Sequence, residues 1–450
     1  MKKIFAVLLC IVMIFLLSSC GEDNKNNINA NQGSAEIYFL NFKPEVSEVY
    51  NEIAKAYEKE KGVKVKVVTA ASDTYETTLK SEISKNEAPT IFQINGPVGY
   101  QAWKNYCLDL KNTKLYSFLI DKDMAVKDGD SVYGIPYVIE GYGIIYNGQI
   151  MDKYFNLPEK SVEISSVEEI NSFNKLKAVV EDMTKNKSKL GIDGVFASTS
   201  MSGGESWRWD SHLASVPFYY EMKEKSRDTS SISTAYAAKE TEFRYHLKYK
   251  NLLDLYLNNS ISAKGLLSGK SVNDSMSEFA LGKVAMVQNG NWAWAEIKKV
   301  QGNKVPEESI GYLPLYMGFE NEENQGLCIG TENYLAINSK ASKEKQEASI
   351  AFLEWLFSSE TGKKYVTQRL DFITPFNTFD DDEKPADPLA REILEWMDRD
   401  VETIEWTFNS FPSQEFKTSF SDAMLEYIQG TKDWNYVKDT VIKSWKEERA

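Results

Sequence analysis

Aromatic and amide side chains gather around one glycine in the stretch 279–294, which reads FALGKVAMVQNGNWAW. Two asparagines and two tryptophans surround Gly290, an unusual composition for a plain core. Indole rings offer flat apolar faces, and amide groups both donate and accept hydrogen bonds, so this set suits a small polar ligand. We predict that Asn291 and Trp292 face such a ligand. A buried aromatic pair that closes the start of a helix is the alternative, and it fits Trp294 better than Trp292.

The elements around Gly290 should carry Trp292 to the mouth of a crevice. Gly282 has the position of a residue that ends a helix, and the apolar run 284–287 has the length of a buried strand. A turn at 289–291 would follow the strand. Turns after buried strands lie at the surface, where binding residues are frequent.

Carboxylates and a further tryptophan stand at two other predicted loops. Glu140 precedes a predicted strand at 143–146, where a buried charge would need a partner. An exposed turn residue is the equally supported alternative for Glu140. Glu205 and Trp207 follow the small-residue stretch 198–204, which is typical of a binding loop. For Glu205 the alternative is an acid that stabilises a helix N-terminus.

The region 35–94 alternates strands with helices. We predict strands at 35–41, 63–68 and 89–94 and helices at 44–62 and 73–85. This βαβ pattern indicates an α/β lobe, and such lobes bind ligands beyond the carboxyl ends of their strands. The loops at those ends contain Asn41, Gln93 and Asn95.

Composition excludes several classes of function. The 450-residue chain has a net charge of −14, which argues against a nucleic-acid partner, because phosphate binding relies on clustered Lys and Arg. It contains only 2 histidines and 4 cysteines, without the clustering of a zinc site. Cys107 and Cys328 are expected to be separate buried thiols, although a pair is possible in an exported protein. We predict no metal and no cofactor.

The first residues resemble a lipoprotein leader. Lys2 and Lys3 precede an apolar stretch at 4–17, and small residues stand directly before Cys20, as in the bacterial lipobox. The resemblance implies a signal peptide over 1–19, a lipid on Cys20 and a flexible polar tether over 20–34. An ordinary secretory signal with an incidental cysteine is the alternative.

Several motifs together resemble the solute-binding proteins of bacterial ABC importers, in the carbohydrate group that includes maltose-binding protein. The stretch 282–294 is similar to that family's GKxAMxxxGxW signature. Residues 133–137 through 146–147 resemble the hinge crossing. Residues 311–314 and 352–356 resemble the return crossing and the helix after it.

The resemblance implies an α/β fold of two lobes of the type II periplasmic-binding-protein class, each a sheet flanked by helices, joined by hinge crossings. Lobe 1 would comprise 35–138 plus 315–368, and lobe 2 would comprise 139–314 plus 369–450. It also implies a monomeric binding protein without enzyme activity. Held by its lipid on the extracellular face of the cell membrane, the protein would capture a carbohydrate, an oligosaccharide, between the lobes and deliver it to ABC transporter permease subunits.

The resemblance assigns roles to single residues. Trp292 matches the tryptophan that stacks on a sugar ring, and Glu140 matches a carboxylate that accepts from sugar hydroxyls. Glu205 and Trp207 resemble an acid and aromatic pair from the second lobe, and Asn41 fits the loop after the first strand. At Gln93 and Asn95, and at 43–44, the chain differs from maltose-binding protein, which argues against maltose itself.

Two other functions remain compatible with these residues. A secreted glycosidase would use two acids such as Glu140 and Glu205 as acid and base, although no catalytic motif is present. A receptor for a non-sugar solute, such as a peptide or a polyamine, would use the acids and aromatic rings to bind a cation.

Overall fold

The computed structural model describes residues 36–70, 72–198, 200–201 and 204–450. These residues belong to one compact unit, Ala35–Ala450. The predicted signal peptide, the lipid attachment at Cys20 and the tether over 20–34 lie outside the described residues.

The first sheet has six strands in the order β2-β1-β3-β11-β5-β4. β1 pairs in parallel with β2 and β3, whereas β11 is antiparallel to both β3 and β5, and β4 is antiparallel to β5. The strands are β1 (Ile37–Asn41), β2 (Val65–Thr69), β3 (Ile91–Asn95), β4 (Val126–Asp128), β5 (Ser131–Pro136) and β11 (Asn333–Ile337).

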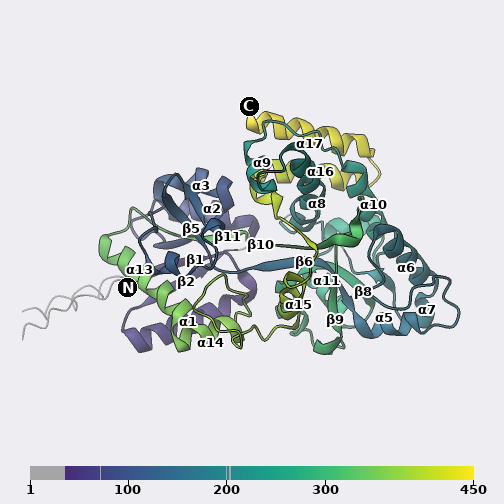
Figure 1. The fold of residues 1–450 in the computed structure, drawn as a ribbon, viewed down its shortest axis with the longest axis horizontal. Helices are drawn as coiled ribbons and strands as arrows, with labels where there is room; N and C mark the ends of the chain where they lie inside the picture. Colours follow the sequence, from purple (N-terminus) through teal and green to yellow (C-terminus); the bar gives the residue numbers. More distant parts are fainter. Residues whose placement is uncertain (1–35, 71, 199, 202–203) are drawn as a thin grey trace, which may run out of the picture. The chain divides into compact units, whose positions relative to one another are not determined.

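Helices cover both faces of the first sheet (Figure 1). Consecutive strand residues point to opposite faces, so Ile37 and Phe39 pack in the core with α1, α13 and α14, whereas Tyr38 and Leu40 pack in the core with α2 and α3. These helices, with the short α4, are α1 (Ser47–Lys61), α2 (Ser72–Glu82), α3 (Gly96–Trp103), α4 (Lys114–Phe118), α13 (Lys343–Ser358) and α14 (Glu360–Gln368).

The second sheet has the order β12-β10-β6-β8-β7, and β9 pairs with β6. Its centre is β6, which runs antiparallel to β8, β9 and β10. The strands are β6 (Glu140–Asn147), β7 (Gly194–Phe196), β8 (Val284–Gly290), β9 (Ile310–Leu313), β10 (Gln325–Gly330) and β12 (Glu402–Ile404).

Helices cover both faces of this sheet as well. The consecutive residues Ile144 and Ile145 of β6 point to opposite faces, and each packs in a different core cluster. The helices are α5 (Gly148–Phe155), α6 (Phe173–Lys185), α7 (Lys187–Leu190), α8 (Ala214–Lys225), α9 (Ser231–Ala237), α10 (His246–Asn258), α11 (Val272–Ala280), α12 (Trp294–Ile297), α15 (Pro388–Met397), α16 (Gln414–Ile428) and α17 (Trp434–Arg449).

Short helical turns link these elements. A π-helix, η4 (Arg208–Leu213), leads into α8. The 3-10 turns are η1 (Pro44–Val46), η2 (Lys104–Tyr106), η3 (Lys122–Met124), η5 (Lys264–Gly269), η6 (Asn291–Ala293), η7 (Glu307–Ser309), η8 (Glu322–Asn324) and η9 (Thr407–Ser410).

The chain passes between the two sheets at three places. The first passage joins β5 to β6, the second joins β10 to β11, and the third follows α14. At the first and third passages, the Ile139 amide donates to the Ile373 carbonyl oxygen at 2.7 Å. The assignment of 315–368 to lobe 1 needs correction, because β10 lies in that range and pairs with β6 of the second sheet.

The stretch around Gly290 differs from its prediction in one respect. Gly282 follows α11 with a φ of +68°, a left-handed conformation that suits a glycine after a helix. The strand does not end before Asn289, however, because the ladder between β6 and β8 continues through Gly290. The turn is the 3-10 segment η6, which begins at Asn291, two residues later than predicted.

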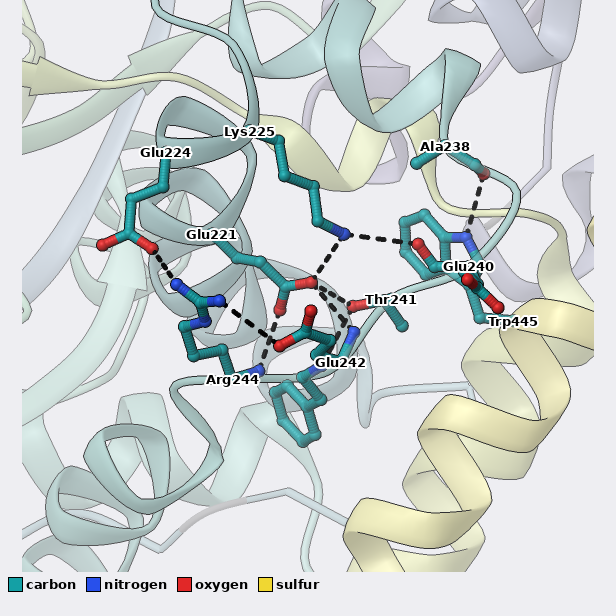
Figure 2. A network of polar contacts seen from close by, with 10 residues as sticks. Glu221, Glu224, Lys225, Ala238, Glu240, Thr241, Glu242, Arg244 and Trp445 are labelled. Atoms are coloured by element: carbon teal, nitrogen blue, oxygen red, sulfur yellow. Dashed lines mark hydrogen bonds and ion pairs between the residues drawn. The ribbon is translucent and has the colours of Figure 1, made fainter.

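A buried carboxylate, that of Glu221, fixes the segment after α9 against α8 (Figure 2). Glu221 is 3% exposed, and it accepts from Thr241 Oγ1 at 2.9 Å, from the Glu242 amide at 3.0 Å and from the Arg244 amide at 2.9 Å. Lys225 Nζ lies 2.9 Å away. Burial raises the pKa of Glu221, but these donors outweigh burial and hold the pKa below its ordinary value.

Replacing Glu221 by Ala should lower the free energy of unfolding by about 3 kcal/mol, because several buried donors lose their acceptor. The matched control is Glu224→Ala on the same helix. Glu224 is half-exposed and pairs with Arg244 and Tyr245 at the surface, so its loss should cost about 0.5 kcal/mol or less. Urea unfolding at about pH 7 measures both. Equal losses for the two variants would contradict the role given to Glu221.

The same carboxylate predicts a pH dependence. A pKa lowered by folding stabilises the protein above the unfolded pKa of about 4.3 and loses this effect as pH falls through the lower folded value. The stability difference between the wild type and Glu221→Gln should therefore shrink below about pH 4. A difference that grows as the pH falls would contradict this assignment.

Candidate functional site

A cavity of about 590 Å³ is lined by residues from the ends of both sheets. The first sheet contributes the loop after β1 and the end of β3, and the second contributes the start of β6, the π-helix η4, η6 and α16. The lining residues used below are Lys43, Glu45, Asn95, Glu140, Glu205, Trp207, Arg208, Asp210, His212, Trp292, Glu296, Glu332, Trp406, Lys417 and Asp422.

Three tryptophans and one histidine form an aromatic cluster in the cavity, and Phe42 also lines it. The ring centroid of Trp292 lies 5.9 Å from that of Trp207 and 6.4 Å from that of Trp406. His212 lies against all three, at 4.6 Å from Trp207 and 5.6 Å from Trp292. Burial, and then the charge of Arg208, hold the pKa of His212 far below its usual range, so the imidazole is neutral at physiological pH.

The position of Trp292 depends on a glycine at the end of β8. A Cβ atom on Gly290 would lie 2.2 Å from the Trp292 ring, far inside van der Waals contact. The ring therefore lies directly over the end of the strand. Trp294, two residues later, is only 3% exposed and packs in the core, as its sequence position predicted.

A buried ion pair joins the two sheets at the cavity. Lys43 Nζ lies 2.6 Å from Glu140 Oε1 and 3.8 Å from Glu45 Oε1. Burial lowers the pKa of Lys43, but the charges of Glu140 and Glu45 outweigh burial and raise it above its ordinary value. Lys43 is thus a permanent cation, held by carboxylates on either side. Glu140 is therefore paired with a lysine, and neither interpretation of Glu140 from the sequence named this partner.

Glu205 and Trp207, the predicted acid and aromatic pair, both lie near Arg208. Glu205 Oε2 accepts from the Val272 amide at 2.7 Å, so this carboxylate stabilises the N-terminus of α11 while it lines the cavity. The Arg208 guanidinium lies 4.0 Å from the centre of the Trp207 ring. Burial lowers the pKa of Arg208 to about 10, which still leaves it charged at neutral pH.

Five of the eight predicted binding residues line the cavity: Asn95, Glu140, Glu205, Trp207 and Trp292. These residues are separated by up to 197 positions in the sequence, yet they surround one volume.

The other three predicted residues, Asn41, Gln93 and Asn291, do not line the cavity. Asn41 is fully buried and holds the next turn, donating from Nδ2 to the Lys43 carbonyl oxygen at 2.9 Å. Gln93 accepts from the Phe42 amide at 2.5 Å and donates to the Tyr137 hydroxyl. Asn291 accepts from the Gly141 amide at 3.0 Å. Each side chain bonds to a neighbouring loop or strand and so shapes the site indirectly.

Several lining residues were not predicted. Arg208 and His212 belong to the π-helix, a rare element that is frequent at functional sites and that has no simple sequence signal. Trp406 and Lys417 come from a C-terminal region whose helical pattern gives no hint of a cavity. The charged residues Glu296 and Glu332 resemble ordinary surface acids in the sequence.

Some buried polar atoms at the cavity lack a partner among the described residues. They are Trp292 Nε1, Trp406 Nε1, Arg208 Nε, His212 Nδ1 and Glu296 Oε2. Buried polar groups are normally hydrogen-bonded, so the polar groups of this site are incompletely satisfied in this conformation. Within the described ranges, no group of three or more His, Cys, Asp or Glu side chains has the arrangement of a metal site.

Comparison with known families gives one match that spans most of the chain. The profile of the family described as bacterial extracellular solute-binding protein matches residues 52–388. No curated protein sequence matches the chain. No helix in the described part of the chain is both long and apolar enough to cross a bilayer.

Solved structures share the fold over almost the whole chain. RafE in complex with raffinose is 20% identical, with a TM-score of 0.67, and covers 93% of this chain and 100% of its own. A chitin oligosaccharide binding protein is 16% identical, with a TM-score of 0.68 and coverage of 92% and 99%. A sugar transporter of Bacillus licheniformis in complex with stachyose is 16% identical, with a TM-score of 0.65 and coverage of 92% and 100%. The predicted α/β fold of two lobes is confirmed.

Replacing Gly290 by Ala should displace the Trp292 ring, because the new methyl group would occupy its place. We expect a loss of about 1–3 kcal/mol in the free energy of unfolding and increased quenching of tryptophan fluorescence by acrylamide. The control is Gly269→Ala, since nothing lies within 4 Å of a Cβ atom there. A Gly290→Ala protein as stable and as well shielded as the control would contradict this packing.

Proposed function

We propose that this chain, which belongs to the bacterial extracellular solute-binding proteins, binds an oligosaccharide in its cavity and delivers it to an ABC transporter permease. In this proposal the protein binds its ligand without converting it. Asn95, Glu140, Glu205, Trp207 and Trp292 are the proposed contacts among the predicted residues.

The observation that carries the proposal is the combination of three indole rings with many polar groups around one cavity. A pyranose has an apolar face of C–H groups and a rim of hydroxyls. Indole faces cover the first, and carboxylates, amides and cationic side chains pair with the second. A hydroxyl that loses its partner costs about 1–3 kcal/mol, which makes the site selective. Relatives of this fold in complex with raffinose and stachyose support a sugar as the ligand.

The three passages between the sheets suit a hinge. Lys43 comes from the loop after β1, whereas Glu140 begins β6, so residues on both sides of the first passage meet at the cavity. A ligand that contacts both lobes binds the closed form more tightly than the open form and shifts the population toward it. We propose that closure on the sugar presents the loaded protein to the permease.

A thermal-shift screen tests the sugar proposal, with raffinose, stachyose, maltose and chitin oligosaccharides as the first probes. A ligand at about 100 times its Kd stabilises the folded state by about 2.7 kcal/mol, which raises the melting temperature measurably. Chromatography of the recovered sugar distinguishes a receptor from a glycosidase. Intact sugar at one equivalent supports the receptor, and hydrolysed sugar contradicts it.

Replacing Trp292 by Ala should weaken binding of the sugar identified in this screen by about 30- to 100-fold. Burying about 100 Å² of a sugar face contributes about 2.5 kcal/mol at about 25 cal/mol/Å². Trp292→Phe keeps an aromatic face and should lose much less. Calorimetry that gives the wild-type Kd for Trp292→Ala would remove this residue as the stacking partner.

The proposed anchor rests on the sequence around Cys20. A diacylglycerol on the Cys20 sulfur would hold the protein at the extracellular face of the cell membrane, and the polar tether would keep the binding domain in water. Cys20→Ser should abolish incorporation of a labelled fatty acid and release the protein from the membrane fraction. A labelled Cys20→Ser protein would contradict this site of attachment.

A further inference from the structure

Acidic side chains outnumber basic ones around the cavity. Among the described lining residues there are three cationic side chains, those of Lys43, Arg208 and Lys417. Seven carboxylates line the same volume: Glu45, Glu140, Glu205, Asp210, Glu296, Glu332 and Asp422. A ligand with a negative charge would therefore enter a strongly unfavourable potential.

Each of the three cations lies near at least two of these carboxylates. Lys43 lies between Glu140 and Glu45, at 2.6 and 3.8 Å. The charges of Glu296 and Glu205 act on Arg208.

The third cation, Lys417, acts on both Glu332 and Asp210. Glu332 comes from the second passage between the sheets, and Asp210 comes from the π-helix. The carboxylates of the cavity are therefore only partly neutralised by the protein's own cations.

Burial makes this excess of negative charge energetically unfavourable. It raises the pKa of Glu45, Glu296 and Glu332, and it raises that of Asp210 to about 6, although a cation lies near each of them. A desolvated carboxylate is stabilised by an additional positive charge, so a cation that enters the cavity gains energy from several of these groups together.

Glu45 and Glu296 are the best placed of these carboxylates. Glu45 belongs to η1 after the first strand of sheet one, whereas Glu296 belongs to α12 after β8 of sheet two. η1 and α12 pack against each other, and both carboxylates line the cavity. The charge of Glu296 contributes to the raised pKa of Glu45. The Glu296 Oε2 atom is buried and has no partner among the described residues.

The aromatic rings favour the same kind of ligand. A cation over an indole face within about 6 Å is attracted by the ring, and the attraction grows when water is excluded. Arg208 uses Trp207 in this way at 4.0 Å. Trp292, which is partly exposed, offers further indole surface in the same cavity, whereas Trp406 is buried behind it.

We propose that the oligosaccharide bound in this cavity carries a protonated amine, as in an amino sugar, and that its ammonium group lies between Glu45 and Glu296. This inference rests on the proposed function and specifies its ligand. An ammonium there would neutralise one carboxylate from each lobe, so the charge of the ligand would also favour closure.

Calorimetry with matched oligosaccharides tests the charge directly. The probes are β-1,4-linked oligomers of glucosamine, N-acetylglucosamine and glucose of equal length, with galactosamine and galactose as a second pair. Within a set, only the substituent at C2 changes.

At about pH 6 an amino sugar should bind at least about tenfold more tightly than its neutral parent, and added salt should reduce the advantage. At about pH 9, where the amine is neutral and the carboxylates stay charged, the advantage should disappear.

The variants Glu45→Gln and Glu296→Gln should each reduce affinity for the amino sugar by about 3- to 10-fold more than affinity for the neutral parent. Glu48→Gln is the matched control, since Glu48 is an exposed residue near Glu45 that does not line the cavity. It should change neither affinity.

The outcomes separate the two proposals. A neutral parent that binds as tightly as its amino sugar overturns the cationic ligand and leaves the sugar receptor standing. Binding of a simple diamine such as putrescine, without binding of any sugar, overturns the sugar and keeps the cation. A panel without any binder contradicts both.

Discussion

The buried contact between Lys43 and Glu140 is the interaction on which the rest of the site depends. Its two partners come from different sheets, and their charges are almost completely removed from water. Two desolvated ions are tolerated only when they are paired and hydrogen-bonded, so the loop after β1 and the start of β6 must meet in one geometry. Asn41 fixes that loop through the Lys43 backbone, and Asn291 fixes the start of β6 through the Gly141 amide. The polar residues behind the cavity therefore support the charged residues that line it.

The second feature that shapes the site is the close packing of aromatic rings over the backbone. Trp292 can cover the end of β8 only because Gly290 has no side chain. His212 then lies between the rings as a neutral imidazole, because burial and the nearby Arg208 charge oppose its protonation. Aromatic and charged side chains are therefore mixed around the cavity, as the Arg208 guanidinium over the Trp207 ring illustrates.

Features that depend on neighbouring residues in the sequence were predicted correctly, whereas features that depend on distant residues were not. Strands at 35–41, 63–68 and 89–94 were predicted to within two residues of β1, β2 and β3. Alternation at 63–68 and short apolar runs in the other two ranges are local signals. The direction of a side chain at the end of a strand depends on residues that folding brings next to it, and not on the local sequence. Asn41 ends β1 and Gln93 lies within β3, and neither lines the cavity, because their side chains bond to neighbouring backbone and side-chain groups.

The sequence by itself determined the fold class, the helix end at Gly282 and the separate environments of Trp292 and Trp294, because hydrophobic periodicity and glycine positions specify them locally. Only the tertiary structure decided which charges meet. Trp406 and Lys417 reach the cavity from more than 100 residues beyond Trp292, and Lys43 finds Glu140 across 97 positions. Burial then sets the charge of each group, since the loss of water changes the pKa of Asp210 and His212. No pattern along the chain encodes that loss of water, because it arises from residues brought together by folding.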